Sequence, residues 1–301
     1  MPKDVYTMAD LRDWPAAAAG EPLRLSVFGD PVKHSRSPQM HDAALAAAGI
    51  AAKYVRLHIQ PAELSEALRL LPVQGFIGTN VTIPHKAATL ALMDEVDPAA
   101  LRAGGVNTVV VHGEKLVGYS TDGPGLARAI QDEFGADLRD LRVMILGAGG
   151  GAGRAIAVQC ATERCRRLML VNRTYERALA LAEEIMPDGP VEAVPWNEKA
   201  LDSRLQGIDL IINATPLGMS GPSESPIPAS MLRPDQMVYD TVYTAHRTPL
   251  LAAADEAGAH AANGLSMLLH QGALSFEIWF NQPAPIEAMR KALEAGKSSA
   301  D

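Results

Sequence analysis

The sequence predicts a two-domain α/β protein in which mostly parallel sheets are covered by helices. Apolar segments of strand length alternate with segments of helical periodicity, first over residues 25–93 and again over residues 142–241. Such alternation is typical of parallel β-α-β units. The length of 301 residues also exceeds what a single hydrophobic core usually supports, because domains average roughly 150 residues.

The first alternating stretch follows an N-terminal extension, residues 1–24. It begins with a buried strand at residues 25–28, which stops at the turn cluster Gly29-Asp30-Pro31. Ser37 before Pro38 is typical of a helix start, with the serine as N-cap and the proline at the first helical position. The elements expected from there are helix 38–48, strand 54–58, helix 63–71, strand 75–81, helix 86–93 and hairpin strands 106–111 and 115–119.

The second alternating stretch follows a helix expected over residues 123–134. It opens with an apolar strand at residues 142–146, and a glycine run comes directly after that strand. The elements expected next are helix 154–162, strand 168–172, helix 174–185, strand 209–213 and strand 237–241. The last residues, 291–301, read as a helix end with a frayed tail.

Composition narrows the classes of function. The chain is 48% hydrophobic and 21% charged, as in an ordinary globular protein. Its net charge of -8 argues against a nucleic-acid partner, because phosphate backbones favour a basic face. The first residues contain no continuous apolar run, and no stretch of about 18 apolar residues follows, so we expect neither a signal peptide nor a membrane span. Cys160 and Cys165 lack the spacing of a metal or redox site, so we expect no metal and a reduced, cytoplasmic setting.

The glycine run lies between a strand and a helix, which is the context of a dinucleotide-binding loop. In LGAGGGAGRA, Gly147 permits a tight turn and Gly149 lets the backbone approach a pyrophosphate, whose charge a helix N-terminus attracts. The run has one glycine more than the common spacing, so the third fingerprint position is Gly151, Ala152 or Gly153. The alternative is a flexible glycine linker. The residues expected to contact the cofactor here are Gly147, Ala148, Gly149, Gly150, Gly151 and Ala152.

The end of the next strand favours NADP over NAD. An NAD site usually has an acidic residue there, about 20 residues after the glycine loop, to bind the ribose. This sequence instead reads VNRTYER. Arg173 offers a planar fork for the adenosine 2′-phosphate, Arg177 follows one helical turn later, and Asn172 and Thr174 add hydrogen-bonding groups. The competing interpretation is that both arginines are solvated charges at a helix start.

Several short motifs follow one another along nearly the whole chain: HSRSP, NVTIPHK, GGVNT, STDG, GAGG, NRT, NATPLGM and GLSMLLHQG. In this order, over residues 25–280, the sequence closely resembles the shikimate dehydrogenase family. The resemblance implies a substrate domain formed by residues 25–124 and 264–301 and a Rossmann-type NADP-binding domain at residues 125–263. It also implies reversible, NADPH-dependent reduction of 3-dehydroshikimate to shikimate in aromatic amino-acid biosynthesis.

By this resemblance the catalytic pair is Lys86, which ends NVTIPHK, and Asp122, which lies in STDG. Reduction of a ketone needs a proton donor at the developing alkoxide, and the reverse reaction needs a base there. A lysine held by a carboxylate supplies charge, positioning and a proton path. Which of the two carries the transferred proton is open. An ordinary surface ion pair would be the interpretation for either residue seen singly.

The resemblance also assigns residues to the substrate. Ser35 and Ser37 match the serines that bind the carboxylate, a role suited to hydroxyls at a helix start, although Ser37 can equally be an ordinary cap. The ring hydroxyls and the rest of the substrate would contact Asn80, Thr82, Asn107, Asp122, Tyr243 and Gln271. Paired donors and acceptors let such a site reject analogues that lack a hydroxyl. A loop-tying role is the alternative for Asn107.

The nicotinamide side of the cofactor is implied to contact Ala214, Thr215, Pro216, Gly264 and Met267. Two positions depart from the family pattern, since Ser120 replaces a usual Asn and Ala245 a common Pro. These departures keep a quinate/shikimate dehydrogenase of broader specificity as the alternative enzyme. A non-catalytic ligand-sensing homologue is the alternative from another class. We expect a small-molecule substrate and a monomer or homodimer.

Overall fold

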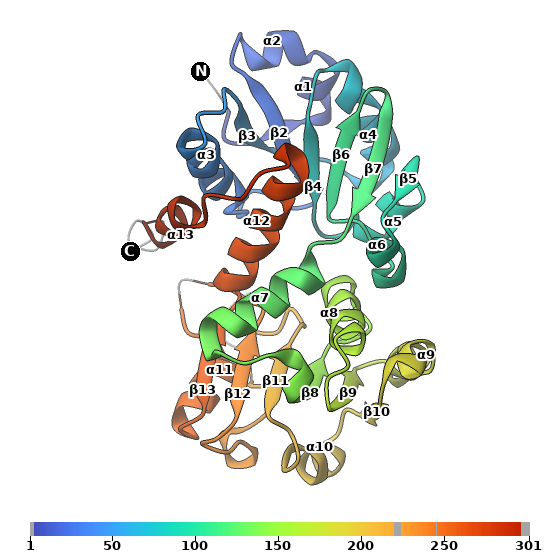
Figure 1. Ribbon diagram of the computed structural model, residues 1–301, viewed down its shortest axis with the longest axis vertical. Helices are drawn as coiled ribbons and strands as arrows, with labels where there is room; N and C mark the ends of the chain where they lie inside the picture. The colour runs from blue at the N-terminus through green and yellow to red at the C-terminus, as the bar shows by residue number, and fades with distance from the viewer. Residues whose placement is uncertain (1–2, 220–223, 245, 296–301) are drawn as a thin grey trace. The chain divides into compact units, whose positions relative to one another are not determined.

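The computed structural model describes residues 3–219, 224–244 and 246–295 (Figure 1). By its internal contacts the chain divides into two units, Met1–Thr121 with Leu269–Asp301 and Asp122–Leu268. None of the described helices is long and apolar enough to span a membrane. The tail expected to fray beyond residue 295 lies outside the described residues, and so does Ala245.

The first unit is built on a seven-stranded sheet with the order β1-β3-β2-β4-β6-β7-β5. Its strands are β1 (Tyr6–Thr7), β2 (Leu23–Gly29), β3 (Lys53–His58), β4 (Gly78–Val81), β5 (Glu95–Val96), β6 (Thr108–His112) and β7 (Lys115–Tyr119). Strands β1 to β4 pair in parallel, and β6 is antiparallel to both β4 and β7. The mostly parallel sheet and the hairpin predicted from the sequence are therefore confirmed.

The helices of the first unit differ from the sequence prediction at Ser37, where α3 begins. They are α1 (Met8–Arg12), α2 (Trp14–Ala18), α3 (Ser37–Ala47), α4 (Leu64–Val73), α5 (Lys86–Leu90), α6 (Pro98–Ala103) and α13 (Ile286–Ala295). Helix α12 (Leu265–Phe280) continues from the second unit into the first. The prediction of Ser37 as N-cap is wrong, because its backbone is already helical and Arg36 precedes the helix.

The N-terminal segment, which lies outside the family resemblance, is an integral part of the first unit. Tyr6 of β1 pairs with Leu57 of β3 and adds a strand to the sheet edge. Trp14 is 4% exposed, its ring centroid lies 5.1 Å from that of Tyr6, and its indole N–H donates to the Leu23 carbonyl at 3.3 Å. Burial of two large aromatic side chains of this kind stabilises the edge of the sheet.

The second unit contains a six-stranded sheet with the order β10-β9-β8-β11-β12-β13, parallel throughout. Its strands are β8 (Arg142–Leu146), β9 (Arg167–Asn172), β10 (Val191–Pro195), β11 (Leu210–Asn213), β12 (Met237–Asp240) and β13 (His260–Asn263). Counted along the chain, this is the order 3-2-1-4-5-6 of a dinucleotide-binding sheet. Ligands bind such sheets beyond the carboxyl ends of the strands where the order reverses, here at β8 and β11.

Helices cover both faces of the second sheet (Figure 1). They are α7 (Asp122–Phe134), α8 (Gly151–Thr162), α9 (Tyr175–Ile185), α10 (Glu198–Leu205) and α11 (Pro249–Glu256). Successive side chains of β8 point to opposite faces, so Ile145 joins the core under α7 and α8, whereas Met144 joins the core under α10 and α11. Strands buried on both faces read as continuous apolar runs, which is why the sequence located β8 well.

Candidate active site

The glycine run forms the turn between β8 and α8. Gly147 has φ +85°, a left-handed conformation that favours glycine, and its N–H donates to the Val171 carbonyl at 2.8 Å. A Cβ on Gly153 would lie 2.2 Å from the Gly147 carbonyl oxygen, whereas a Cβ on Gly151 would meet nothing within 4 Å. The third fingerprint glycine packs the helix against the turn. Of the three possibilities that the sequence left open, the structure therefore selects Gly153.

The second glycine of the fingerprint contacts the segment that was expected to select NADP. A Cβ on Gly149 would lie 2.9 Å from the Arg177 Cβ and 3.1 Å from the Asn172 Nδ2. The Asn172 amide donates to the Thr174 carbonyl at 2.9 Å and so fixes the turn from β9 into α9. Arg173 and Arg177 are both exposed. The fold thus brings the glycine turn and the VNRTYER segment together on one face of the second unit.

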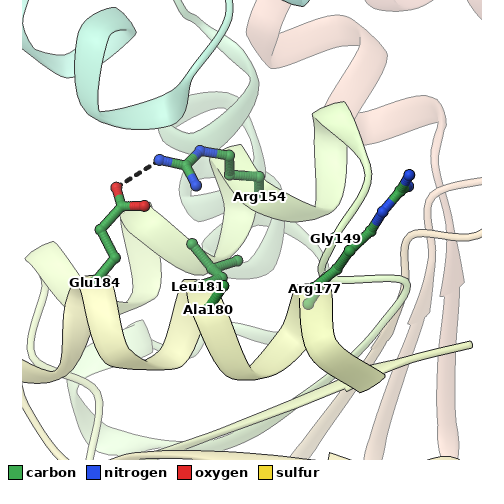
Figure 2. Close-up of a pocket in the computed structure, with 7 residues that line it drawn as sticks. Gly149, Arg154, Arg177, Ala180, Leu181 and Glu184 are labelled. Atoms are coloured by element: carbon green, nitrogen blue, oxygen red, sulfur yellow. Dashed lines mark hydrogen bonds and ion pairs between the residues drawn. The ribbon is translucent and has the colours of Figure 1, made fainter. Parts of the chain in front are cut away.

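A pocket lies beside this turn, between α8 and α9 (Figure 2). Its lining residues are Ala148, Gly149, Arg154, Arg177, Ala180, Leu181 and Glu184. Arg154 pairs with Glu184 at 2.5 Å, and the Arg177 side chain extends away from this pair along Gly149. Arg154 is not among the residues expected from the sequence, although its place on the helix that follows the glycine turn is a signal for a residue near phosphate.

A buried pair at the ends of β11 and β12 shapes the NATPLGM loop. The Asn213 amide donates to Asp240 at 2.9 Å, and its carbonyl oxygen accepts from the Thr215 hydroxyl at 2.7 Å and the Thr215 N–H at 3.1 Å. Asp240 also accepts from the Thr248 hydroxyl at 2.6 Å, and burial raises the pKa of its carboxyl group. A Cβ on Gly147 would lie 2.7 Å from the Thr215 methyl group. The loop that holds Ala214, Thr215 and Pro216 is therefore seated against the glycine turn.

The start of α12 is fixed by equally close contacts. A Cβ on Gly264 would lie 2.0 Å from the Thr241 carbonyl oxygen, so only glycine fits there. The Met267 N–H donates to the Tyr239 hydroxyl at 2.9 Å, and that hydroxyl also bonds with Ser266. Gly264 and Met267, both expected near the nicotinamide, thus follow β13 at the carboxyl edge of the sheet. Tyr243, half-buried, follows β12 at the same edge.

The two serines of HSRSP lie together at the start of α3. The Ser35 hydroxyl bonds with the Ser37 hydroxyl at 3.2 Å and accepts from the Ser37 N–H at 3.3 Å. The Ser35 N–H donates to the Val32 carbonyl at 3.0 Å. Ser37 is buried and Ser35 half-buried. Two hydroxyls beside the N-terminus of an 11-residue helix can bind a carboxylate, because the helix dipole favours negative charge there.

Asn80 is held by partners within the first unit. Its oxygen accepts from the Tyr54 hydroxyl at 2.7 Å, and its amide nitrogen has acceptors at 3.0–3.1 Å in Asn107, Thr108 and Ser275. An amide offers two donors and two acceptor lone pairs, and these partners use both donors and one of the lone pairs. The chemistry of Asn80 is therefore mainly that of a tie between β3, β4, β6 and α12.

Asn107 ties the chain directly before Asp122. Its oxygen accepts from the Thr121 N–H at 2.8 Å, and its amide nitrogen donates to the Thr121 hydroxyl at 2.9 Å and to Gln271 at 3.4 Å. This is the loop-tying role that the sequence left as an alternative. The bond to Gln271 also places two expected substrate residues side by side in the first unit.

Lys86 begins α5 and is half-buried, and Thr82 precedes it by four residues. The Lys86 carbonyl accepts from the Val106 N–H at 2.9 Å, and the neighbouring His85 ring bonds with the Ile59 carbonyl at 2.7 Å. These contacts hold the backbone on which the lysine is mounted. Asp122 is 5% exposed and opens α7, the first helix of the second unit.

The residues described above offer two kinds of chemistry. The serine hydroxyls and the glycine turn supply hydrogen-bond donors for anions, and Lys86 and Asp122 are titratable groups suited to proton transfer. Within the described parts of the chain, no three His, Cys, Asp or Glu side chains group so as to hold a metal ion.

Three family models match the chain. They describe a shikimate dehydrogenase substrate binding domain at residues 27–109, a shikimate / quinate 5-dehydrogenase at residues 128–219 and a shikimate 5'-dehydrogenase C-terminal domain at residues 264–294. The N-terminal segment precedes the first match.

Individual proteins agree with these matches. A shikimate dehydrogenase (NADP(+)) from Moorella thermoacetica is 43% identical over 272 residues, which cover 89% of this chain and 92% of the relative. The structure of shikimate 5-dehydrogenase from Thermus thermophilus, in complex with NADP(H) and shikimate, superposes with TM-score 0.81 at 37% identity, covering 91% and 99% of the two chains. Quinate dehydrogenase from Corynebacterium glutamicum, in complex with NAD, gives TM-score 0.80 at 29% identity, covering 91% and 99%.

Proposed function

The chain belongs to the shikimate dehydrogenase family, and from this premise we propose how its residues carry out the reduction of 3-dehydroshikimate to shikimate. The three family matches and the 43% identity to an NADP-dependent relative support the assignment to this family. The chain is an NADP-dependent oxidoreductase of aromatic biosynthesis, as its relatives are, and the resemblance found in the sequence motifs is confirmed.

NADP(H) fits the residues of the second unit. Gly147 and Gly153 shape a turn that leads into α8, and the N–H groups at the N-terminus of that helix would attract a dinucleotide phosphate. At the end of β9 stands Asn172 rather than an acidic residue, and the exposed Arg173 and Arg177 follow. Two guanidinium groups suit a 2′-phosphate, because arginine forms bidentate charge-assisted hydrogen bonds with phosphate oxygens. When bound, the nicotinamide supplies or accepts the hydride.

We propose that Ser35 and Ser37 bind the substrate carboxylate. The two hydroxyls that bond with each other at 3.2 Å would turn to the carboxylate oxygens, and the dipole of α3 adds a favourable field. The ring hydroxyls of the substrate would form hydrogen bonds with Thr82, Asn107, Asp122, Tyr243 and Gln271. Asn80 acts mainly by holding Asn107 and α12 in place.

Lys86 and Asp122 act on the oxygen at the reacting carbon. During reduction this oxygen gains negative charge as the carbonyl carbon accepts the hydride, and it must then take up one proton. A lysine ammonium stabilises the developing charge and can donate the proton, and the carboxylate orients the lysine. In the reverse direction the same pair removes the proton from the hydroxyl.

A second candidate, quinate/shikimate dehydrogenase of broader specificity, is favoured by the likeness to an NAD-bound quinate dehydrogenase and by Ser120 in place of the family's usual Asn. Steady-state kcat/KM with shikimate or quinate, each with NADP and NAD, decides between them. We expect shikimate with NADP to be preferred. A preference for quinate with NAD overturns the assignment, and the absence of turnover with any pair favours a ligand-sensing homologue.

We further propose a cytoplasmic location and a monomer or homodimer. Cys160 and Cys165 are both buried and unbridged, which fits a reducing compartment. Light scattering on the purified chain measures the assembly directly.

A further inference from the structure

The guanidinium group of Arg56, on β3, holds the backbone of the serine loop. Its Nε donates to the Ser35 carbonyl oxygen at 2.9 Å, and its Nη2 donates to the same oxygen at 2.7 Å. The Arg56 side chain is only 11% exposed. A buried charge is costly unless its hydrogen bonds are satisfied, so a guanidinium in this position is held firmly by its acceptors.

The remaining donors of Arg56 connect the serine loop to its surroundings. Nη2 also donates to Gln39 Oε1, in the first turn of α3, at 3.2 Å. Nη1 pairs with Asp4 Oδ1 of the N-terminal segment at 2.9 Å. One side chain thus links the N-terminal segment, the loop before α3 and α3 itself.

The sheet explains why Arg56 reaches the loop. Residues two apart on a strand point to the same face, so Arg56 shares a face with Tyr54, whose hydroxyl bonds with Asn80. The neighbours Val55 and Leu57 join the core on the other face, together with Tyr6 and Trp14. Arg56 is therefore the charged residue of β3 that the register aims at the start of α3.

We propose that Arg56 is a positioning residue for the substrate carboxylate site and that Asp4 holds Arg56 in its working orientation. The inference rests on the proposed function, in which Ser35 and Ser37 bind the carboxylate. Because a peptide unit is planar, fixing the Ser35 carbonyl also fixes the Arg36 N–H and limits the path of the chain into Ser37. The serine hydroxyls are then oriented before substrate arrives, so less freedom is lost on binding.

The role of Arg56 is separable from general stability. An Arg56→Ala variant should raise KM for shikimate about tenfold or more, as expected for the loss of a charge-assisted anchor, with KM for NADP nearly unchanged. The matched control is Arg12→Ala. Arg12 forms a two-bond pair with Glu66 on the surface of the same unit, at 2.8 Å for each bond, and its guanidinium is thereby directed to α4 rather than to the serine loop.

A substrate pair makes the test specific for the carboxylate. Shikimate is compared with its analogue in which the carboxylate is reduced to a hydroxymethyl group. In Arg56→Ala, kcat/KM for shikimate divided by kcat/KM for the hydroxymethyl analogue should fall about tenfold, because only the carboxylate of shikimate binds to the serine loop. An equal loss for both compounds, or an unchanged KM for shikimate, overturns the inference.

Two milder variants keep the test informative if Arg56→Ala folds poorly. Arg56→Lys keeps the charge but loses the forked geometry and should show an intermediate KM. Asp4→Ala removes a 67%-exposed partner and should raise KM for shikimate by about twofold, since exposed ion pairs contribute little. Unchanged KM values in both variants also overturn the inference.

Wild-type turnover separates the proposed function from the role of Arg56. A wild-type chain without shikimate–NADP activity contradicts the proposed function itself. An active wild type whose Arg56 variants behave like Arg12→Ala contradicts only the role of Arg56.

Discussion

Gly153 of α8 packs against Gly147 so closely that a Cβ at residue 153 would lie 2.2 Å from the Gly147 carbonyl oxygen. Real Cβ atoms do not approach an oxygen to this distance, so any side chain here displaces the helix from the turn. The spacing Gly147, Gly149, Gly153 is one residue longer than the common fingerprint, yet it preserves the tight turn, the close backbone approach and the helix contact.

Gly153→Ala should therefore destabilise the protein without any cofactor present. We expect a lower Tm in thermal unfolding of the cofactor-free chain, with a loss of about 1–3 kcal/mol, typical of overpacking. Gly151→Ala is the matched control, because a Cβ there meets nothing within 4 Å and alanine is a better helix former than glycine. Equal Tm values for the two variants would contradict the assignment of Gly153 as the third fingerprint position.

Lys86→Ala should lower kcat by about 10²- to 10⁴-fold, the usual contribution of a positioned acid–base group. Binding of NADPH, followed by fluorescence titration, should change little, since Lys86 belongs to the first unit and the glycine turn to the second. Lys115→Ala is the control. Lys115 pairs with Glu95 at 2.7 Å on the exposed hairpin of the same unit, so its loss should leave kcat unchanged. Normal turnover in Lys86→Ala would rule out its catalytic role.

Arg173→Ala should raise KM for NADP by about 10- to 100-fold, because a hydrogen-bonded charge contact contributes roughly 1.5–3 kcal/mol. KM for NAD should hardly change, since NAD has no 2′-phosphate. Arg167 stands at the other end of β9 and pairs with Glu192 at 2.8 Å, so Arg167→Ala controls for loss of a surface charge. Equal effects of Arg173→Ala on both cofactors would refute the phosphate contact.

The sequence predicted best the elements whose pattern is local. Strand β8 was expected at residues 142–146 and is observed with the same bounds, because it is apolar on both faces and ends at a glycine turn. The N-terminal strand β1 was missed. Its two residues gain their structure from pairing with β3, some fifty positions later, and nothing in the local pattern reports that partner.

The site was predictable as a set of motifs but not as a network. Asn80 lies in a motif that suggested a ligand contact, whereas its amide bonds with Ser275, 195 residues away. Asn213 and Asp240 end two strands that are neighbours only in the folded sheet, so their pairing could not be inferred from either strand alone. Long-range hydrogen bonds of this kind depend on topology, which side-chain spacing does not encode.

His41 should make the free energy of unfolding depend on pH. It lies on α3, is fully buried and stacks on Tyr54 with ring centroids 4.5 Å apart. Burial outweighs the opposing effect of Asn80 and lowers the pKa of His41 from 6.5 to about 3. Between these two pH values the unfolded chain binds a proton that the folded chain does not.

The free energy of unfolding should consequently fall as pH falls below about 6.5, by about 1.4 kcal/mol per pH unit from this residue alone. Asp42 and Asp240 act in the opposite direction, since burial raises the pKa of each carboxyl group and favours the folded state at low pH. The contribution of His41 therefore has to be isolated by comparing variants rather than read from the wild-type curve.

His41→Phe and His41→Asn both remove the titrating ring, one keeping an aromatic contact with Tyr54 and the other not. Urea unfolding of the cofactor-free chain, from about pH 6.5 down to about pH 4.5, should show a shallower decline in both variants than in the wild type. His112→Asn is the control for the loss of a histidine elsewhere, because His112 is exposed on the hairpin. The two His41 variants differ in packing, but both lack the titrating imidazole. If the free energy of unfolding falls with pH in parallel for the wild type and both variants, His41 does not set the acid sensitivity of the fold.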